Sequence, residues 1–471
     1  MAVMYPRLFA ILCGAFLMTS THAAFAADDS STTFPEYLRA KASETRDNEA
    51  QEAERMRRLR RDFGLDAAAM LKKIQNVIPD ATKADLEKWT NDRSLQWLVL
   101  DGEVRYFRRE PANLLRVNKE AKARKGKEEE KAVAADPSLR DTAKFVLNDH
   151  LSDAVQAAQS QSTTTVLPVR FRVEHVIRVK PGVVPKGETI RCWMPFPQDY
   201  RHQRGGENLR TQPENHEIAP NGVPMRTVYM EQPSAGTSET VFRAQYEYAS
   251  ADYLSGVGDK GSPMDLSNPE TSAALESRLP HLDLTSDLRA LAASIVGDET
   301  DPVVKARLIW LWIDGNIGYS SEFEYAIMPR IVEKIMATRR GDCGVQALFF
   351  MALCRAAGVP ARWQSGWVTR PGGWNMHDWT EFWAGDAQGW VPADPSAGVR
   401  STAKDDAVKY FFFGGIDAYR MIANLDYARP FDPPKQHWAS DPVDNQRGEV
   451  EWSGGNLYYD AWDYDVKVEA F

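Results

Sequence analysis

The sequence predicts an α+β protein of several domains, because the hydrophobic periodicity divides its 471 residues into three successive patterns. Residues 34–162 follow a mostly helical pattern, residues 166–248 alternate with a period of two, and residues 285–396 combine helices with a closing pair of strands. An apolar content of 43% with 26% charged residues is typical of a globular protein. The length suggests about three domains.

The net charge of the chain bears on its partners. A formal charge of −9 argues against nucleic acid as the main partner. The arginine-rich run at residues 55–61 has acidic residues on both sides, so we interpret it as the solvated face of a helix.

The first 26 residues are predicted to be an export signal. Arg7 supplies the positive charge, residues 8–18 form a short apolar core, and Ala24-Phe25-Ala26 matches a cleavage pattern. The mature chain is therefore expected to begin near Ala27, in the periplasm or the medium. Because the apolar run is far shorter than the ~20 residues of a spanning helix, we expect no integral membrane segment after cleavage. The alternative is an uncleaved anchor.

The regions that precede and follow the last α+β segment are assigned in order. Residues 34–162 are expected to be mostly helical, with a hairpin at residues 96–107 around the turn pair Asp101-Gly102. The period-two residues 166–248, divided by Pro, Gly and Asn clusters, predict a separate antiparallel, β-sandwich-like domain. Residues 397–471 are aromatic and poorly periodic, and we expect a C-terminal extension that packs on the core.

One cysteine stands out by its context. Three cysteines remain after signal removal, so at least one thiol is free. Apolar residues after Cys343 recur at helical spacing, which places this cysteine at the start of a helix over residues 343–357. A helix start favours negative charge and lowers the pKa of a thiol. Cys354, inside the same helix, and Cys192, in a β-run, are expected to be structural.

A histidine and an aspartate are predicted to accompany this thiol. His377 begins a strand, and a two-residue turn at residues 386–387 would pair residue 379 with residue 394. Asp394 would then lie diagonal to His377 on the same face of the sheet. We expect the Cys343 sulfur to face one ring nitrogen of His377, and Asp394 to face the other.

Four motifs resemble those of the transglutaminase-like superfamily in its bacterial branch. They are Gly341-Asp342-Cys343-Gly344, the segment from Leu353 to Arg362, His377-Asp378-Trp379-Thr380-Glu381, and the segment from Gly389 to Pro395. The resemblance covers about residues 285–396, and residues 413–420 look like the tail that follows such cores. It implies a papain-like α+β core in which Cys343 is the nucleophile, His377 the base and Asp394 the orienting acid.

The resemblance implies a thiol acyl-transfer enzyme that acts on protein or peptide amides through a thioester. The same residues would serve a cysteine peptidase or amidase that uses water, so this alternative stays open. A third reading is a non-catalytic scaffold with the same fold, which loss of one of the three residues would mark; all three are present.

Two further residues are candidates for the site. Tyr319 could be a second oxyanion donor, and Trp379 could wall a substrate groove, although most of the tryptophans near the site could equally be core. No cofactor or metal is expected, because the chain has no HExxH, Cys-x-x-Cys, phosphate-loop or EF-hand motif. The calcium dependence of some animal members of the superfamily has no ligand spacing here to support it.

Overall fold

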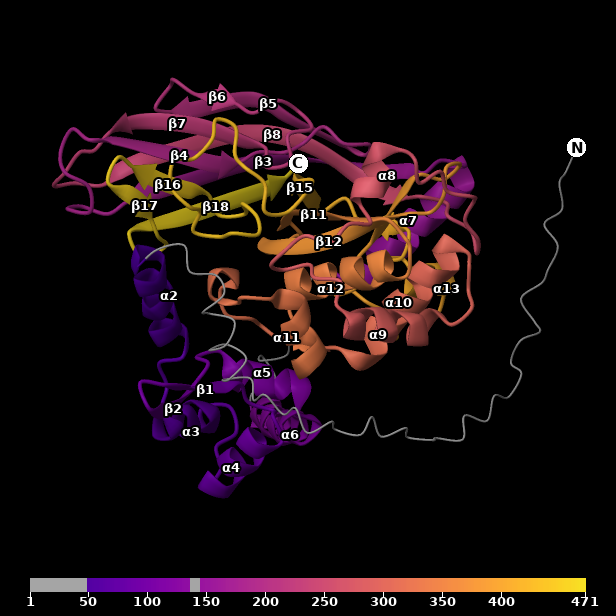
Figure 1. Cartoon of the computed structure of the whole chain (residues 1–471), viewed down its shortest axis with the longest axis horizontal. Coiled ribbons are helices and arrows are strands. Elements are labelled where there is room, and N and C mark those ends of the chain that lie inside the picture. Colours follow the sequence, from indigo (N-terminus) through magenta and orange to yellow (C-terminus); the bar gives the residue numbers. More distant parts are fainter. Residues whose placement is uncertain (1–48, 136–144) are drawn as a thin grey trace, which may run out of the picture.

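The computed structural model of the chain describes residues 49–135 and 145–471. The predicted export signal at residues 1–26 lies outside these ranges. Within them, the protein is the α+β molecule that the sequence predicts, with a layered β domain above a mixed helix and sheet core in the view of Figure 1. A small, mostly helical N-terminal region lies at one side of the core.

The N-terminal region is built from short amphipathic helices and one hairpin. Its elements are α2 (Glu49–Asp62), α3 (Ala67–Gln75), α4 (Lys83–Asn91), β1 (Trp97–Leu100), β2 (Glu103–Tyr106), α5 (Glu110–Val117), α6 (Lys119–Ala135) and α7 (Leu147–Gln161). The hairpin turns at Asp101-Gly102, both with positive φ, as a type I′ turn requires. The α7 helix lies apart from the others and buries Leu151 and Val155 in the main core.

The β domain consists of two antiparallel sheets. One has the order β14-β8-β3-β18, with β5 also paired to β8; the other has the order β17-β16-β4-β7-β6. The strands from the predicted domain are β3 (Thr165–Val179), β4 (Thr189–Pro195), β5 (Gln203–Gln212), β6 (Glu217–Ile218), β7 (Thr227–Pro233) and β8 (Thr240–Leu254). Alternating residues of β3 such as Phe171, Val173 and Ile177 point into a shared apolar cluster.

The C-terminal extension differs from its expected role. Instead of only packing on the core, it supplies β14 (Gly415–Ile416), β16 (Glu449–Trp452), β17 (Gly455–Leu457) and β18 (Trp462–Ala470) to the two sheets of the β domain. Trp462 and Val466 of β18 enter the same apolar cluster as β3. The β domain is therefore continuous with the rest of the molecule, and its strands come from both halves of the chain.

The core combines a buried helix with a four-stranded antiparallel sheet of order β13-β12-β11-β15. Its main elements are α9 (Ser286–Val296), α10 (Pro302–Asn316), α11 (Ile331–Thr338), α12 (Cys343–Ala356), β11 (Ala361–Val368), β12 (Asn375–Trp383), β13 (Trp390–Ala393) and β15 (Arg420–Asn424). The α12 helix is apolar on nearly all sides and is buried along its length, as expected for a helix at the centre of a core.

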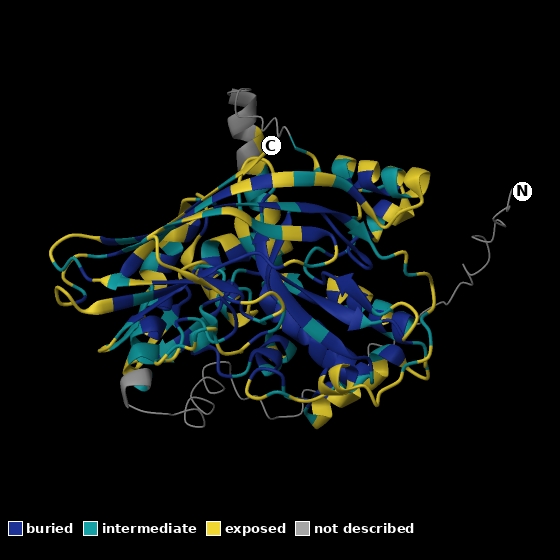
Figure 2. Cartoon of the chain, turned by 90° about the horizontal axis from the view of Figure 1, so that it is seen from above, coloured by how far each residue is buried: buried dark blue, intermediate teal, exposed yellow. Residues whose placement is uncertain are grey.

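The sheet has a different neighbour on each face. On one face, Phe382 of β12 contacts Phe350 of α12, with ring centroids 6.5 Å apart. On the other face, Trp379 packs with Ile416 and Ile422 toward the β domain. Figure 2 shows the central strands buried along most of their length, with exposed residues concentrated in the outer helices and loops. The sheet that carries the predicted histidine is thus held from both sides.

Short elements complete the surroundings of the α12 start. The α8 (Pro269–Ala273) and α13 (Asp406–Lys409) helices lie at the periphery, and η2 (Tyr325–Ile327) precedes α11. The β9 strand (Gly318–Tyr319) pairs in parallel with β10 (Arg340–Gly341), which aligns Tyr319 with Gly341. This pairing brings the loop after α10 next to the residues that lead into Cys343.

Candidate active site

Cys343 is the first residue of α12, as the sequence predicts. Asp342 caps the helix, because its Oδ1 accepts a hydrogen bond from the Val345 N–H at 3.2 Å and another from the Tyr325 hydroxyl at 2.7 Å. Gly344 follows where space is scarce: a Cβ there would lie 2.2 Å from the Tyr325 hydroxyl oxygen. The absence of a side chain at Gly344 thus leaves room for Tyr325.

The strands that follow have the register inferred from the turn. Trp383 pairs with Trp390 and Thr380 with Ala393, so residue 379 aligns with residue 394. Asp394 consequently reaches the face of His377, and its Oδ2 lies 2.7 Å from His377 Nε2. The second ring nitrogen, Nδ1, is left for another partner.

Asp394 is held firmly at both carboxylate oxygens. Oδ2 also accepts from Arg420 Nη1 at 2.5 Å, and Oδ1 accepts from the N–H groups of Ser396 and Ala397, each at 2.9 Å. Burial alone would raise the pKa of Asp394, but His377 and Arg420 outweigh it and keep the pKa well below its usual range. Burial lowers the pKa of His377 despite the opposing charge of Asp394. Asp394 therefore stays ionised and fixes the imidazole.

The position of the thiol differs from the expected one. Among the described residues, the hydrogen bond of Cys343 Sγ goes to Asp378 Oδ2 at 3.3 Å and not to His377. The physical reason is strand alternation: Asp378 points toward α12, so the neighbouring His377 ring points to the other face. The main-chain N–H of Asp378 also interacts with the sulfur. Cys343 therefore lies against the peptide that joins His377 to Asp378.

The pKa of the Cys343 thiol is also shifted in the direction opposite to the one expected at a helix start. Burial, followed by the charges of Asp378 and Asp342, raises the pKa of Cys343 well above its usual value. Helix N–H groups favour a thiolate, but burial and the two carboxyl groups outweigh them. In the arrangement described, Cys343 is a protonated thiol at neutral pH.

Cys343 opens into a cleft of about 260 Å³ that is lined mainly by polar residues. Tyr319, the candidate oxyanion donor, lies in this cleft, and the charge of Cys343, more than burial, raises the pKa of its hydroxyl. The N-terminal region contributes part of the wall. Its residues at the cleft are Asp62, Arg108, Arg109 and Arg116.

Trp379 does not line the cleft, contrary to its predicted place in a substrate groove. Its side chain is 1% exposed, donates to Gln364 Oε1 at 2.8 Å and stacks near His377. Strand alternation again explains this, since Trp379 shares the His377 face and is covered by the β domain. The tryptophans near the site are core and cover, because none is among the residues that line the cleft.

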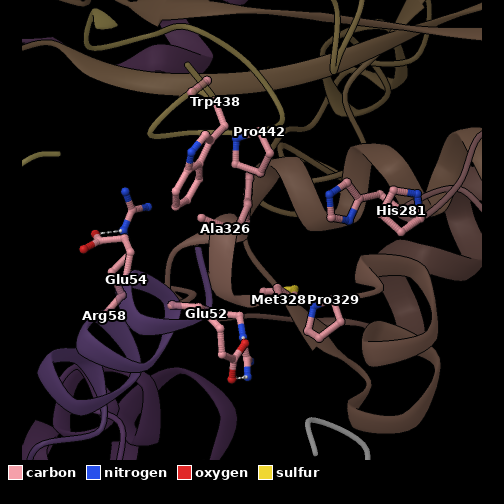
Figure 3. A pocket seen from close by; sticks show the side chains of 13 residues that line it. Glu52, Glu54, Arg58, His281, Ala326, Met328, Pro329, Trp438 and Pro442 are labelled. Atoms are coloured by element: carbon pink, nitrogen blue, oxygen red, sulfur yellow. Dashed lines mark hydrogen bonds and ion pairs between the residues drawn. The ribbon is translucent and has the colours of Figure 1, made fainter. Parts of the chain in front are cut away.

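A second cavity of about 250 Å³ lies beside the cleft, and Tyr325 lines both. In Figure 3, Trp438 and Pro442 face Glu54 and Arg58 of α2 across it, and His281 lies on the far side. This cavity holds none of the predicted site residues. Tyr325, which bonds the helix cap Asp342, is the partition between the two spaces.

Several site residues were missed by reasoning from the sequence. Arg420 lies on β15, which is not adjacent to β13 in the sheet, so no local pattern connects it with Asp394. Gln446 comes from a loop of irregular sequence, yet its Nε2 donates to Asp378 Oδ1 at 2.7 Å and to the His377 carbonyl at 3.0 Å. Asp378 is next to His377 in the sequence, but which of the two faces α12 depends on how the helix packs on the sheet.

The described part of the chain contains three cysteines, and all three are buried and free of disulfide bonds: Cys192, Cys343 and Cys354. Burial raises the pKa of both Cys192 and Cys354, which suits structural thiols. Within residues 49–135 and 145–471, no cluster of three or more His, Cys, Asp or Glu side chains is arranged to hold a metal ion. No helix in the same ranges is both long and apolar enough to span a bilayer.

Comparison with known sequences gives a family match and two partial relatives. The model of the transglutaminase-like superfamily matches residues 289–395. A peptide-N(4)-(N-acetyl-beta-glucosaminyl)asparagine amidase of Gallus gallus is 37% identical over 67 residues, which are 14% of this chain and 9% of that protein. An uncharacterized protein of Haemophilus influenzae is 35% identical over 88 residues, 18% of this chain and 23% of the relative. The chain thus spans less than a quarter of either relative.

Two solved structures have low sequence identity to this chain and partial structural similarity to it. A candidate cysteine protease from Cytophaga hutchinsonii is 16% identical, with a TM-score of 0.44 over 65% of this chain and 91% of the other. The periplasmic domain of TgpA from Pseudomonas aeruginosa is 16% identical, with a TM-score of 0.25 over 51% of this chain and 90% of the other. The family match covers the helix that begins at Cys343 and the hairpin that carries His377 and Asp394. Residues 289–395 of this chain thus match the transglutaminase-like superfamily.

Proposed function

We propose that the protein is a thiol acyl-transfer enzyme that acts on protein or peptide amides through Cys343, His377 and Asp394. The observation that carries this proposal is that Cys343 contacts β12 beside His377, whose ring is held by Asp394. The thiol opens a buried helix, its sulfur touches the residue after His377, and Asp394 holds the His377 ring at 2.7 Å. This order of nucleophile, base and orienting acid is the one that covalent catalysis by a thiol requires.

The reaction would proceed in two steps, acylation of Cys343 and transfer of the acyl group. The Cys343 sulfur gives its proton to His377 Nδ1 and attacks the carbonyl carbon of the amide. The C–N bond breaks, and the leaving amine takes the proton from His377, which leaves a thioester on Cys343. An amine or water then attacks the thioester carbon, and the sulfur departs and regains a proton by way of His377.

Stabilisation of the oxyanion would come from the helix start and the cleft wall. The main-chain N–H of Cys343 belongs to the first turn of α12, where N–H groups have no partner within the helix. The raised pKa of Tyr319 keeps its hydroxyl protonated, so it can donate to a developing negative charge. Because Cys343 contacts Asp378 and the His377 ring lies on the other face of β12, proton transfer would require a rearrangement that brings the His377 ring to the sulfur.

Hydrolysis is the second candidate outcome. The Gallus gallus relative, which matches over 67 residues, is named as an amidase. The two outcomes share the acyl-enzyme and differ only in the acceptor. We also propose that the chain is exported and that its substrate is a protein or peptide, with export resting on the signal pattern of residues 1–26.

The test uses a library of glutamine- and asparagine-containing peptides with a fluorescent primary amine in the buffer. Acyl transfer predicts fluorescent peptide products, whereas hydrolysis predicts released amine or ammonia without incorporation. Both must disappear in Cys343→Ala. Product formation by Cys343→Ala would refute the proposal, and so would the absence of any turnover across the library together with an unreactive Cys343.

A further inference from the structure

Asp378 is a buried carboxylate that the proposed reaction does not use, although it is the side chain in contact with the nucleophile. It is 4% exposed, and its Oδ2 accepts from Cys343 Sγ at 3.3 Å. The side chain also sits tightly above the start of α12, since a Cβ on Gly344 would lie 2.7 Å from the same oxygen. A charged residue in this place needs a reason, because burial of a carboxylate is unfavourable.

The carboxylate is fixed from its other side by the loop before β16. Gln446 Nε2 donates to Asp378 Oδ1 at 2.7 Å and to the His377 carbonyl oxygen at 3.0 Å, so one amide holds two neighbouring residues. Asp444, from the same loop, stands beside Asp378, and the two carboxyl groups interact directly. Burial, followed by the charge of Asp444, raises the pKa of the Asp378 carboxyl well above its usual range.

Two carboxyl groups, those of Asp378 and Asp342, act directly on the Cys343 sulfur. The ionisable groups that line the cleft with Cys343 and Asp378 include Asp342 before α12, Tyr319 of β9, Glu322, Glu324, Tyr325 of η2, and Asp441, Asp444, Arg447 and Tyr459 toward the C-terminus. Asp62, Arg108, Arg109 and Arg116 of the N-terminal region line its outer wall. His377 faces the opposite side of β12. Burial, with the charge of neighbouring carboxylates, raises the pKa of Asp342 to about 6 and that of Asp441 to about 7. A thiolate at Cys343 would therefore add one more negative charge to this group.

From this contact we propose that Asp378 is a positioning residue that holds the Cys343 thiol in an unreactive hydrogen bond and sets the pH at which the nucleophile forms. The inference rests on the proposed function, since it concerns the same thiol. Asp378 accepts the thiol proton in a hydrogen bond and keeps the sulfur turned away from His377. Thiolate formation then requires the sulfur to leave the Asp378 oxygen.

The experiment measures the rate of Cys343 alkylation by iodoacetamide from pH 5 to pH 10, in the full chain, with the labelled cysteine identified by peptide mapping. Asp378→Asn is the decisive variant. Asparagine keeps an acceptor for Gln446 and replaces the oxygen beside the sulfur with an N–H donor, which favours the thiolate. We expect the midpoint of the pH profile to fall by at least one unit and the rate at pH 7 to rise by about tenfold or more.

Asp441→Asn is the matched control, because it removes a carboxylate from the same cleft without touching Cys343. Its profile should move by much less than that of Asp378→Asn. Equal shifts in the two variants would mean that only the general field matters, and would overturn the role of Asp378. The role of Asp378 would also be overturned if the pH midpoint of Cys343 labelling in Asp378→Asn equals that of the wild type.

The outcomes separate this inference from the proposed function. If Cys343 of the wild-type protein is not labelled at any pH below unfolding, the nucleophile assignment fails and the inference fails with it. If Cys343 is labelled but the pH midpoint of labelling does not change in Asp378→Asn, only the inference fails. Cys192 and Cys354 are buried and serve as internal reporters, since their labelling would show that a variant has unfolded.

Discussion

At the scale of single residues, strand parity was enough to pair His377 with Asp394, and their side chains meet at 2.7 Å. Parity could not find Arg420, because β15 reaches this sheet through β11 and no local pattern records that neighbour. It also gave no warning that the thiol would contact Asp378 rather than His377. Which of two adjacent strand residues a helix end meets depends on how the helix packs, and sequence spacing does not determine that.

Substitution of Asp394 by asparagine tests the orienting role. Asp394→Asn removes the charge that holds His377 and should lower turnover by about 10³- to 10⁴-fold, because the imidazole adopts the wrong tautomer. Asp417→Asn is the control: Asp417 also contacts Arg420, at 3.1 Å, but the Asp417 carboxylate is not the partner of His377. Rates and thermal unfolding would be measured for both, and similar losses of turnover would contradict the role of Asp394.

Asp444 makes stability depend on pH in a predictable direction. Burial raises the pKa of its carboxyl to about 6, above the value of about 3.9 in an unfolded chain. The folded state therefore favours the protonated form, and stability from this group is present at low pH and lost as the pH rises through about 6. Asp444→Asn should melt at a higher temperature than the wild type at pH 8, with the difference shrinking toward pH 5. A difference that is constant with pH, or of opposite sign, would refute the assignment.

At the scale of elements, local pattern was sufficient for the parts that carry the site. The helix expected at residues 343–357 is Cys343–Ala356, and the two strands after it have the expected register. These elements are short and strongly patterned, so their bounds and register follow from turn residues and hydrophobic periodicity. The packing at the helix start was not predictable, because Tyr325 reaches Gly344 from a loop whose course depends on the pairing of β9 with β10.

Gly344 tests how closely that helix start is packed. In Gly344→Ala, the new Cβ would overlap the Tyr325 hydroxyl and Asp378, and overpacking of this kind costs about 1–3 kcal/mol. We also expect altered alkylation of Cys343, since the next residue has to move. Gly315→Ala, in α10, is the control: its Cβ meets nothing within 4 Å, and alanine favours helix. Denaturant unfolding compares them, and equal stability of the two variants would contradict the close contact.

At the scale of the whole molecule, the two ends of the chain both serve the central domain. The C-terminal strands complete the β domain, and the N-terminal region lines the cleft and holds the loop beside it. Asn113 of α5, for example, accepts from the Ser321 N–H at 2.7 Å. Sequence reasoning could delimit these regions but not join them, because contacts across hundreds of residues leave no periodic signal.

The buried pair of Arg340 and Glu110 tests this long-range connection. Arg340 lies three residues before the nucleophile, and its Nη2 donates to Glu110 Oε1 at 3.0 Å. Burial raises the pKa of Glu110, although the charge of Arg340 acts in the opposite direction. Glu110→Gln leaves a buried guanidinium without its counter-charge and should cost about 3 kcal/mol. The exposed Glu120, paired with Lys88, is the control, and Glu120→Gln should cost less than about 1 kcal/mol. Similar losses in chemical unfolding would show that the pair does not connect the two regions.

The measurement that tests the central claim most directly is the mass of the acyl-enzyme. The protein would be mixed with a peptide amide that it turns over, quenched in acid within one turnover, and analysed intact and after digestion. We predict an added mass equal to the peptide acyl group, located on Cys343, removed by hydroxylamine and absent in Cys343→Ala. An adduct on another residue, or turnover without any covalent intermediate on Cys343, would contradict the account.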